Sequence, residues 1–204
     1  MARKTCSACF RPEKTCICDF ITPIENQIEL GILQHPDEEQ NSKGTAIIAR
    51  LSLQNLSCWA GENFSNDSDF CSWLQEDKVY LLYPPTQDNN PEYSNVTLEQ
   101  LGTLHRELQS KNKRLKVLMI DATWRKSYKI MQLNPKLQKL DRVALQPSQH
   151  SEYRIRKQKD ELSLSSVEAI HDLLSNLEGS KQKYQPLLLA FAKMQALQMS
   201  FYEQ

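Results

Sequence analysis

Short apolar runs alternate with longer amphipathic stretches along most of the chain. Each run is bounded by proline or polar residues and has the length typical of a buried strand. The sequence therefore predicts strands over residues 28–33, 78–83, 115–120 and 142–145. The run Leu-Lys-Val-Leu-Met-Ile at 115–120 predicts the most buried of the four.

Helices are predicted between the strands from apolar spacing and from capping residues. Thr97 with Gln100, and Ser165 with Glu168, match the capping-box pattern that begins a helix. Residues 46–56 have helical apolar spacing. Further helices are predicted from Thr123 to near Pro135, from Ser165 to Gly179 and from Pro186 to Phe201, with loops over residues 60–77 and 86–96.

Alternation of strands and helices predicts an α/β fold, with a mostly parallel sheet flanked by helices. The strands end in Gln34-His35-Pro36, Tyr83-Pro84-Pro85, Asp121-Ala122-Thr123-Trp124 and Gln146-Pro147. In an open parallel sheet the carboxyl ends of the strands share one edge, where such folds bind ligands. We therefore expect the functional site at this edge.

Length and composition limit the class of protein. The chain has 204 residues, of which 40% are apolar, so we expect one full-sized domain with at most a small appendage. It contains no run of eighteen apolar residues and does not open with a secretory signal pattern. We therefore expect a cytoplasmic protein with no membrane association.

The charges are segregated although they sum to zero. Residues 1–110 carry 8 Lys and Arg against 16 Asp and Glu, whereas residues 111–159 carry 14 against 3. A strongly basic segment of this length favours a polyanionic partner over an ordinary solvated surface. Within it, Tyr153-Arg154-Ile155-Arg156-Lys157 interleaves an aromatic residue with cations, a pattern suited to nucleic acid.

Four of the six cysteines lie close together as Cys6-x-x-Cys9 and Cys16-x-Cys18. In a reducing compartment this spacing predicts a tetrahedral Zn²⁺ site with a structural role, and an iron–sulfur cluster is the second metal option. The basic residues around it suggest that this segment also touches nucleic acid; they are Arg3, Lys4, Arg11 and Lys14. Cys58 and Cys71 are expected to be free thiols.

Several common catalytic motifs are missing from the sequence. It contains no G-x-G-x-x-G, no P-loop, no G-x-S-x-G and no H-E-x-x-H. This argues against ordinary Rossmann cofactor binding and against nucleoside-triphosphate hydrolysis.

Asp121 is the strongest catalytic candidate because it follows the most buried predicted strand. A carboxylate there can accept a proton or hold a cationic ligand, although a turn-forming Asp is common at such places. Thr123 suits a helix N-cap, and Trp124 suits packing or stacking on a base. His35 lies at another strand end, whereas His105 and His171 fall in predicted helices and are expected to be structural.

These residues together resemble the DTW-domain family. Asp121-Ala122-Thr123-Trp124 is similar to its D-x-T-W signature. The cysteine segment and four further blocks resemble the family in order and cover nearly the whole chain: Leu33-Gln34-His35-Pro36, Leu82-Tyr83-Pro84, Tyr153-Arg154-Ile155-Arg156-Lys157 and Leu164-Ser165-Ser166-Val167-Glu168-Ala169.

The resemblance implies a tRNA-uridine aminocarboxypropyltransferase. Such an enzyme transfers the 3-amino-3-carboxypropyl group of S-adenosylmethionine to uridine N3, here expected in the tRNA variable loop, and releases methylthioadenosine. It also implies a SPOUT-like, knotted catalytic domain over residues 25–204 behind a zinc knuckle over residues 1–24. We expect a monomer. The alternatives are a SPOUT-type RNA methyltransferase and an inert zinc-knuckle RNA-binding protein.

The expected roles are assigned residue by residue. Asp121, Thr123 and Trp124 are expected in catalysis, with Asp121 either the base for uridine N3 or a group that holds the donor. The donor is expected at Leu82, Tyr83, Pro84, Gln146, Pro147, Ser165, Ser166 and Glu168. Contacts to tRNA are expected from Arg125, Lys126, Tyr153, Arg154, Arg156 and Lys157, and the ligands of Zn²⁺ are Cys6, Cys9, Cys16 and Cys18.

Overall fold

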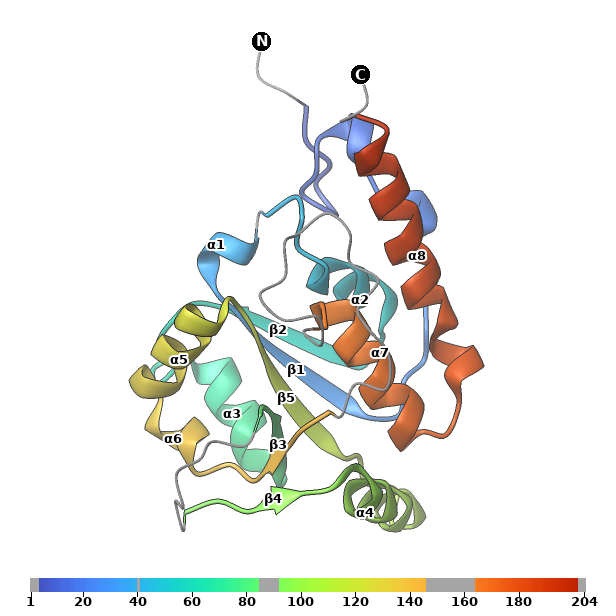
Figure 1. Ribbon diagram of the computed structural model, residues 1–204. Coiled ribbons are helices and arrows are strands. Elements are labelled where there is room, and N and C mark those ends of the chain that lie inside the picture. Colours follow the sequence, from blue (N-terminus) through green and yellow to red (C-terminus); the bar gives the residue numbers. More distant parts are fainter. Residues whose placement is uncertain (1–3, 40, 85–91, 146–163, 202–204) are drawn as a thin grey trace.

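The computed structural model describes residues 4–39, 41–84, 92–145 and 164–201, which form an α/β fold around one sheet (Figure 1). The six strands lie in the order β2-β1-β5-β3-β6-β4, and every neighbouring pair is parallel. They are β1 (Glu29–Gln34), β2 (Leu56–Ala60), β3 (Val79–Leu82), β4 (Asn95–Val96), β5 (Lys116–Asp121) and β6 (Arg142–Val143). The predicted α/β sheet with flanking helices is confirmed.

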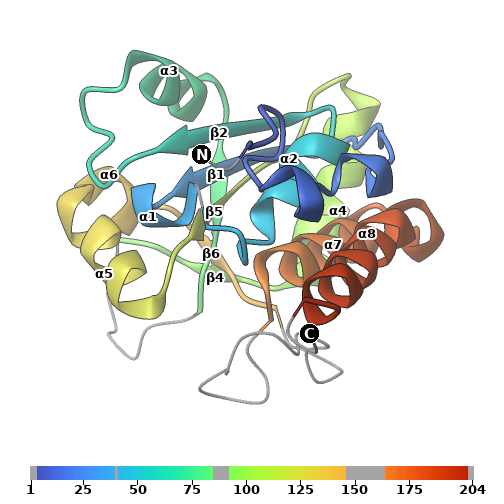
Figure 2. The ribbon, with the colours of Figure 1, turned by 90° about the horizontal axis from the view of Figure 1, so that it is seen from above.

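Helices cover both faces of this sheet (Figure 2). On one side lie α2 (Ala46–Ser52), α4 (Leu98–Ser110), α7 (Ser166–Leu177) and α8 (Lys181–Met199). On the other lie α3 (Ser68–Glu76), α5 (Trp124–Leu133) and α6 (Pro135–Gln138). The short α1 (Pro36–Glu39) follows β1, and two 3₁₀ turns, η1 (Glu13–Thr15) and η2 (Cys18–Phe20), lie near the N-terminus.

Alternating side chains of the strands supply the two cores. Leu30 and Ile32 of β1 pack with α2, α7 and α8, whereas Leu33 packs with α3 and α5. The same alternation in β5 sends Val117 to the first core and Leu118 to the second. Successive residues of a strand point to opposite faces, so a strand covered on both sides is apolar on both, as β5 is from Val117 to Ile120.

Gly31 of β1 lets α3 approach the sheet closely. A Cβ atom at this position would lie 2.8 Å from Cη2 of Trp73 and 2.8 Å from Cδ1 of Leu118. Trp73 is buried, and it therefore occupies the space that a side chain on residue 31 would fill.

The predicted helix over residues 46–56 is too long. The helix α2 ends at Ser52, and residues 56–60 form the edge strand β2, which pairs with β1. The segment 60–77, predicted as a loop, contains α3, whose N-terminus is capped by Asp67 accepting a hydrogen bond from the Phe70 amide. Only a few apolar residues anchor α3 in its core, so its polar exposed side masks the helical pattern.

Two further boundaries differ from the prediction. The last helix begins at Lys181, before the predicted Pro186, because Ser180 caps it through the Lys183 amide. The predicted loop over 86–96 ends in the short strand β4. By contrast, both capping boxes form as predicted, at Thr97 and at Ser165. Within the described ranges, no helix is long and apolar enough to cross a membrane.

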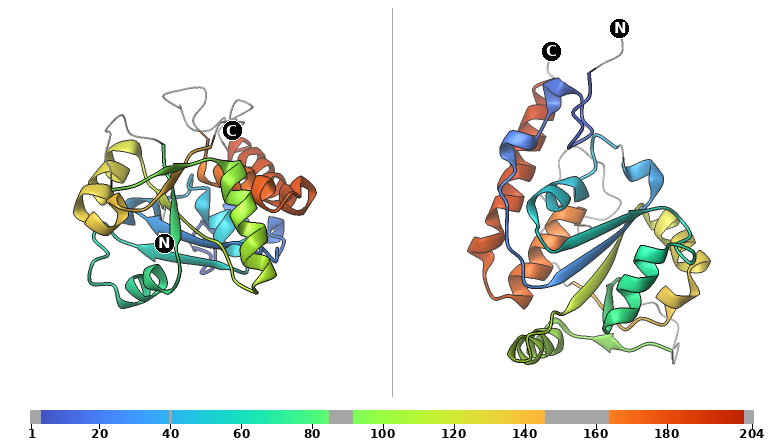
Figure 3. Two further views of the ribbon diagram at one scale, coloured as in Figure 1. Left: turned by 90° about the horizontal axis from the view of Figure 1, so that it is seen from below. Right: turned by 180° about the vertical axis from the view of Figure 1, so that it is seen from behind.

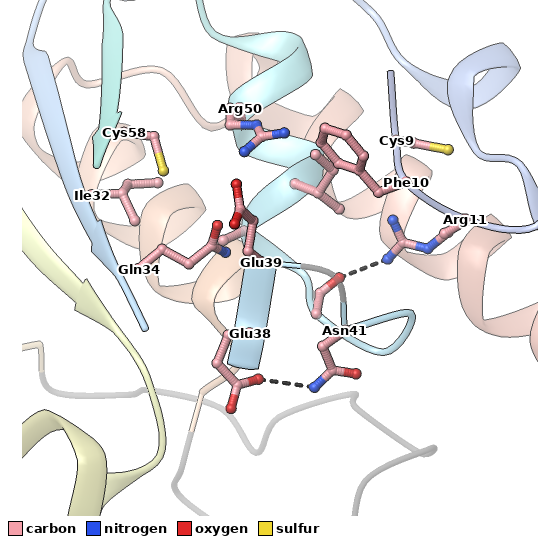
Figure 4. Close-up of a pocket in the computed structure, with 13 residues that line it drawn as sticks. Cys9, Phe10, Arg11, Ile32, Gln34, Glu38, Glu39, Asn41, Arg50 and Cys58 are labelled. Atoms are coloured by element: carbon pink, nitrogen blue, oxygen red, sulfur yellow. Dashed lines mark hydrogen bonds between the residues drawn. The ribbon is translucent and has the colours of Figure 1, made fainter. Parts of the chain in front are cut away.

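The cysteine segment packs beside the distal part of α8, at the end of the molecule where both chain ends lie (Figures 1 and 3). Buried Arg11, labelled in Figure 4, joins this segment to α8 through a 3.1 Å contact of its guanidinium with the Met194 sulfur. It also donates hydrogen bonds to the carbonyls of Ser42 and Gly44, before α2, at 3.1 and 2.7 Å. The expectation that Arg11 touches nucleic acid is therefore wrong, because its guanidinium is enclosed by protein. The knotted path stays a prediction, since residues 146–163 lie outside the described ranges.

Candidate active site

A cavity of about 300 Å³ lies at the carboxyl ends of β3, β5 and β6, beside the first turn of α7. Its walls combine apolar side chains with the Ser166 hydroxyl and the indole of Trp124. The described residues that line it are Leu82, Tyr83, Pro84, Met119, Ile120, Ala122, Trp124, Ala144, Leu145, Leu164, Ser166 and Ala169. It thus lies at the sheet edge where the sequence predicts the site, and it brings together Leu82, Tyr83, Pro84, Trp124 and Ser166.

Asp121 lies behind the wall of this cavity, at the end of β5, and is 8% exposed. Its Oδ2 accepts a hydrogen bond of 2.8 Å from the Gln34 side-chain amide of β1. Its Oδ1 accepts a hydrogen bond from the Ser166 hydroxyl. Both oxygens of Asp121 thus accept hydrogen bonds from uncharged donors. Ser166 connects this buried carboxyl group to the cavity.

The register of the sheet explains why Gln34 belongs to the site. Gln34 is the Cα partner of Asp121 in the parallel β1–β5 pair. Both residues end their strands, and both side chains are buried. Sequence reasoning noted Gln34 only as part of a strand end, because the adjacency of β1 and β5 is needed to place the amide beside the carboxylate.

Ser165 and Glu168 bond to each other at the start of α7. The Glu168 carboxylate accepts hydrogen bonds from the Ser165 amide and hydroxyl, at 2.8 and 2.6 Å. The amide of Val167 in the same turn reaches the Thr45 hydroxyl at 3.3 Å. Of the two adjacent serines, Ser166 therefore offers its side chain to Asp121 and the cavity, while Ser165 holds the helix end.

Aromatic rings form one side of the cavity mouth. The Trp124 and Tyr83 rings meet edge to face, with centroids 6.3 Å apart. The Arg142 guanidinium lies 5.6 Å from the Tyr83 ring centroid and 3.7 Å from that of Tyr93. This cation therefore links the rings of Tyr83 and Tyr93. Thr123 occupies the N-cap position of α5 without a side-chain capping bond.

His35 ties the end of β1 to the end of β5. Its amide donates to the Asp121 carbonyl at 3.1 Å, and its Nδ1 accepts from the Asp37 amide at 3.1 Å. With Nδ1 an acceptor, the proton lies on Nε2, which donates to the Glu62 carboxylate at 2.7 Å. Hydrogen bonds from Lys129 and His35 lower the pKa of Glu62. His35 thus supports the site from outside the cavity.

The predicted tRNA contacts divide into three groups. Arg125 is exposed on α5. Lys126 forms ion pairs with Asp37 and Glu38, at 3.1 and 3.3 Å. The remaining predicted tRNA contacts lie outside the described residues; these contacts are Tyr153, Arg154, Arg156 and Lys157. The predicted donor contacts Gln146 and Pro147 lie outside them as well.

The four N-terminal cysteines form a cluster whose sulfur atoms all lie within 4.8 Å of one another. The Cys6–Cys18 and Cys9–Cys16 sulfurs are 3.6 and 3.7 Å apart. Tetrahedral Zn²⁺ with bonds of ~2.3 Å would separate its sulfurs by about 3.8 Å, so the cluster fits this ion. The amides of Cys9 and Ala8 lower the pKa of Cys6 to about 6, whereas burial and the neighbouring thiols raise the pKa of Cys18. Cys6 is therefore the thiol of the cluster that most readily forms the thiolate that a metal requires.

A small polar recess separates the cysteine segment from the end of β1 (Figure 4). Its volume is about 10 Å³, and Gln34, Arg50 and Cys58 point toward it. This volume is that of about one water molecule. Burial raises the pKa of the Cys58 thiol, so Cys58 is a neutral side chain at ordinary pH rather than a nucleophile.

Comparison with known proteins places these features in one family. The DTW domain family model matches residues 3–199. A Drosophila melanogaster protein named tRNA-uridine aminocarboxypropyltransferase 2 is 31% identical, covering 91% of this chain and 71% of its own length. Proteins of the same name from Macaca fascicularis and Mus musculus are 29% and 28% identical, covering 91% of this chain and 60% of their own lengths. No solved structure matches. The chain belongs to the DTW domain family.

Proposed function

We propose that this protein transfers the 3-amino-3-carboxypropyl group of S-adenosylmethionine to N3 of a tRNA uridine. The observation that carries the proposal is the cavity built from the family's own blocks, at the sheet edge where parallel α/β folds bind ligands. The relatives are named for this transfer to tRNA uridine. The expected target is a uridine of the variable loop.

The reaction requires one bond to form and one to break. Uridine N3 loses its proton and bonds to Cγ of the methionine part, while the Cγ–S bond breaks and its electrons neutralise the sulfonium. The by-product is methylthioadenosine. Because the sulfonium is already a good leaving group, the main task of the protein is to align Cγ, rather than the methyl carbon, with N3.

The cavity suits this task through its shape and polarity. Its volume of about 300 Å³ falls at the lower end of small-molecule sites, and its walls are mainly apolar. Apolar walls suit the adenine and the thioether part of the donor. The Ser166 hydroxyl is a polar group on the described part of the wall, and its hydrogen bond to Asp121 fixes its direction. We place the donor here, with Leu82, Tyr83, Pro84 and Ser166 as its contacts.

Two roles remain open to Asp121 in this proposal. As a base it would accept the N3 proton, which requires that N3 or a water molecule reach the carboxylate. As a fixed anion it would orient the Ser166 hydroxyl and stabilise the binding of the positively charged S-adenosylmethionine. Its two hydrogen bonds and its low exposure support the second role, because both oxygens are already engaged.

We assign the cysteine cluster to Zn²⁺ in a segment of residues 1–24 that precedes a catalytic domain of residues 25–204. Four thiolates fill a tetrahedral ion and leave no open coordination position, so the ion would serve folding rather than the reaction. Cys9 and Ile17 of this segment are buried in the core that α8 also lines. The proposed ion therefore stabilises a surface against which α8 packs.

The basic segment supplies the proposed contact with tRNA. Residues 111–159 carry 14 Lys and Arg against 3 Asp and Glu, and α5 at the cavity mouth lies within this segment. Neutralising phosphates with these cations would make the affinity for tRNA fall steeply with salt.

The test is to incubate the purified protein with S-adenosylmethionine and unmodified tRNA and to identify the nucleoside by-product by mass. Methylthioadenosine, with the matching gain in mass on a uridine, is the expected result. S-adenosylhomocysteine would instead identify a methyltransferase. Binding of tRNA with neither by-product would contradict both enzymatic functions and favour an RNA-binding protein.

A further inference from the structure

Helix α5 carries two large aromatic rings that face solvent. Trp124 is 58% exposed and Tyr128 is 63% exposed. They are four residues apart, so they lie on the same side of the helix about 6 Å apart along its axis. The neighbouring face of α5 packs into the core and carries its buried residues Ser127, Ile130 and Met131. The fold therefore buries one face of α5 and leaves an aromatic face outside.

The packing of the protein does not account for the exposed ring of Tyr128. Trp124 contacts Tyr83 and lines the cavity, whereas Tyr128 makes no hydrogen bond or ring contact with the part of the chain described here. Exposing two neighbouring aromatic side chains to water is unfavourable. We therefore favour a ligand for Trp124 and Tyr128 over a structural role.

The charge around the two rings selects the class of ligand. Residues 124–139 contain five Lys and Arg and no Asp or Glu. Arg125 is exposed between the rings along the sequence, and in the described ranges no ion pair involves it. Exposed aromatics interleaved with cations form the surface that binds single-stranded nucleic acid, since every base has a face that can stack.

Trp124 makes this surface continuous with the proposed site. Its indole belongs both to the cavity wall and to the exposed face of α5. A uridine held at the cavity mouth beside Trp124 would have its neighbouring nucleotide over the next turn of the helix, where Tyr128 lies.

We propose that Tyr128 stacks on an unpaired base next to the target uridine, so that Trp124 and Tyr128 form a two-step platform for the tRNA. This inference rests on the proposed function for the identity of the RNA. It adds a binding residue, Tyr128, outside the family's signature residues. Arg125 acts beside it by contacting phosphate.

The experiment compares four variants for their affinity for unmodified tRNA over a range of salt concentrations. Tyr128→Ala should weaken binding roughly 5- to 150-fold without changing the slope of log affinity against log salt, because it removes stacking and no charge. Tyr128→Phe should bind like the wild type. Arg125→Ala should reduce the slope by about one. Leu189→Ala is the matched control, since Leu189 is 53% exposed on α8, and it should change neither quantity.

A second readout separates this inference from the proposed function. In the methylthioadenosine assay, Tyr128→Ala should raise KM for tRNA and leave KM for S-adenosylmethionine unchanged. If the wild type releases methylthioadenosine but Tyr128→Ala matches Leu189→Ala in affinity and in KM, the stacking role is overturned and the proposed function stands. If the wild type releases none, the proposed function fails, and the affinity series alone decides whether Tyr128 binds RNA.

Discussion

The Ser166 hydroxyl at the start of α7 donates a hydrogen bond to Oδ1 of Asp121 at the end of β5. Asp121 also accepts from Gln34, so three elements converge on one buried carboxylate. Of these three side chains, only Ser166 lines the cavity among the residues described. The charge of Asp121 is therefore expected to act on the cavity through a hydroxyl group whose direction it sets.

Replacing Asp121 with Asn should lower turnover roughly 100-fold or more, because it removes the anion while keeping the size of the side chain. The affinity for tRNA should stay at the wild-type level, since Asp121 is buried away from the basic surface. Steady-state release of methylthioadenosine measures the turnover, and a tRNA binding assay measures the affinity. Turnover near the wild-type rate would remove Asp121 from the mechanism.

Replacing Cys9 with Ser should reduce the zinc content below one ion per chain and lower the free energy of unfolding by ~3 kcal/mol or more. Cys9 is buried, and its sulfur lies 3.7 Å from that of Cys16. Elemental analysis and urea denaturation measure both effects. Cys71→Ser is the matched control, because Cys71 lies on α3 outside the cluster, with its sulfur near the Ser65 carbonyl. Full zinc content in Cys9→Ser would refute the four-cysteine site.

Replacing Gly31 with Ala should destabilise the protein by about 1–3 kcal/mol, because the new methyl group would overlap Trp73 and Leu118. Gly102→Ala on α4 provides the control, since the nearest atom to its added Cβ is Nη1 of Arg106, 3.8 Å away. In a helix interior this change should be neutral or stabilising by up to ~1 kcal/mol. Equal urea midpoints for the two variants would show that α3 moves freely away from the sheet.

Stability should fall in mild acid because of His105 on α4. The side chain is buried, and within the described residues its ring nitrogens have no hydrogen-bond partner. Burial lowers the pKa of His105 below its ordinary value of about 6.5. The unfolded chain therefore binds the proton more readily than the folded protein does. The contribution of His105 to stability is complete at a pH above the ordinary pKa, and it is lost as the pH falls through the lower pKa of the folded state.

Urea denaturation of the wild type and of His105→Leu at pH 7.5 and 5.5 measures this effect. The wild type should lose stability between the two conditions by at most about 1.4 kcal/mol per pH unit from this one group. His105→Leu should lose less, and the difference between the variants isolates the histidine from other titrating groups. Identical losses would mean that His105 does not titrate with unfolding.

Local chemistry made part of this structure predictable. The capping boxes at Thr97 and Ser165 need only residues three positions apart, and both formed. The apolar run of β5 and the position of Asp121 after it follow from burial on two faces of a sheet. The cavity residues Leu82, Tyr83 and Pro84 were placed correctly at a strand end, because parallel strands share an edge.

Relations between distant elements could not be predicted. The strand order β2-β1-β5-β3-β6-β4 places Gln34 beside Asp121. The local sequence around either residue does not predict that β1 and β5 are neighbours. The edge strand β2 was missed, because it is short and the predicted helix overlaps it only at Leu56. The helix α3 was missed because most of its surface is polar, and its packing against Gly31 is a tertiary property.

The bond between Ser166 and Asp121 also has a consequence for synthesis. Its partners are 45 residues apart, and the Gln34–Asp121 bond spans 87 residues. Contacts between such distant positions form late, since the loops between them must close first. A nascent chain that has not yet released α7 from the ribosome lacks the Ser166 hydroxyl, so the arrangement around Asp121 is completed only after α7 has emerged.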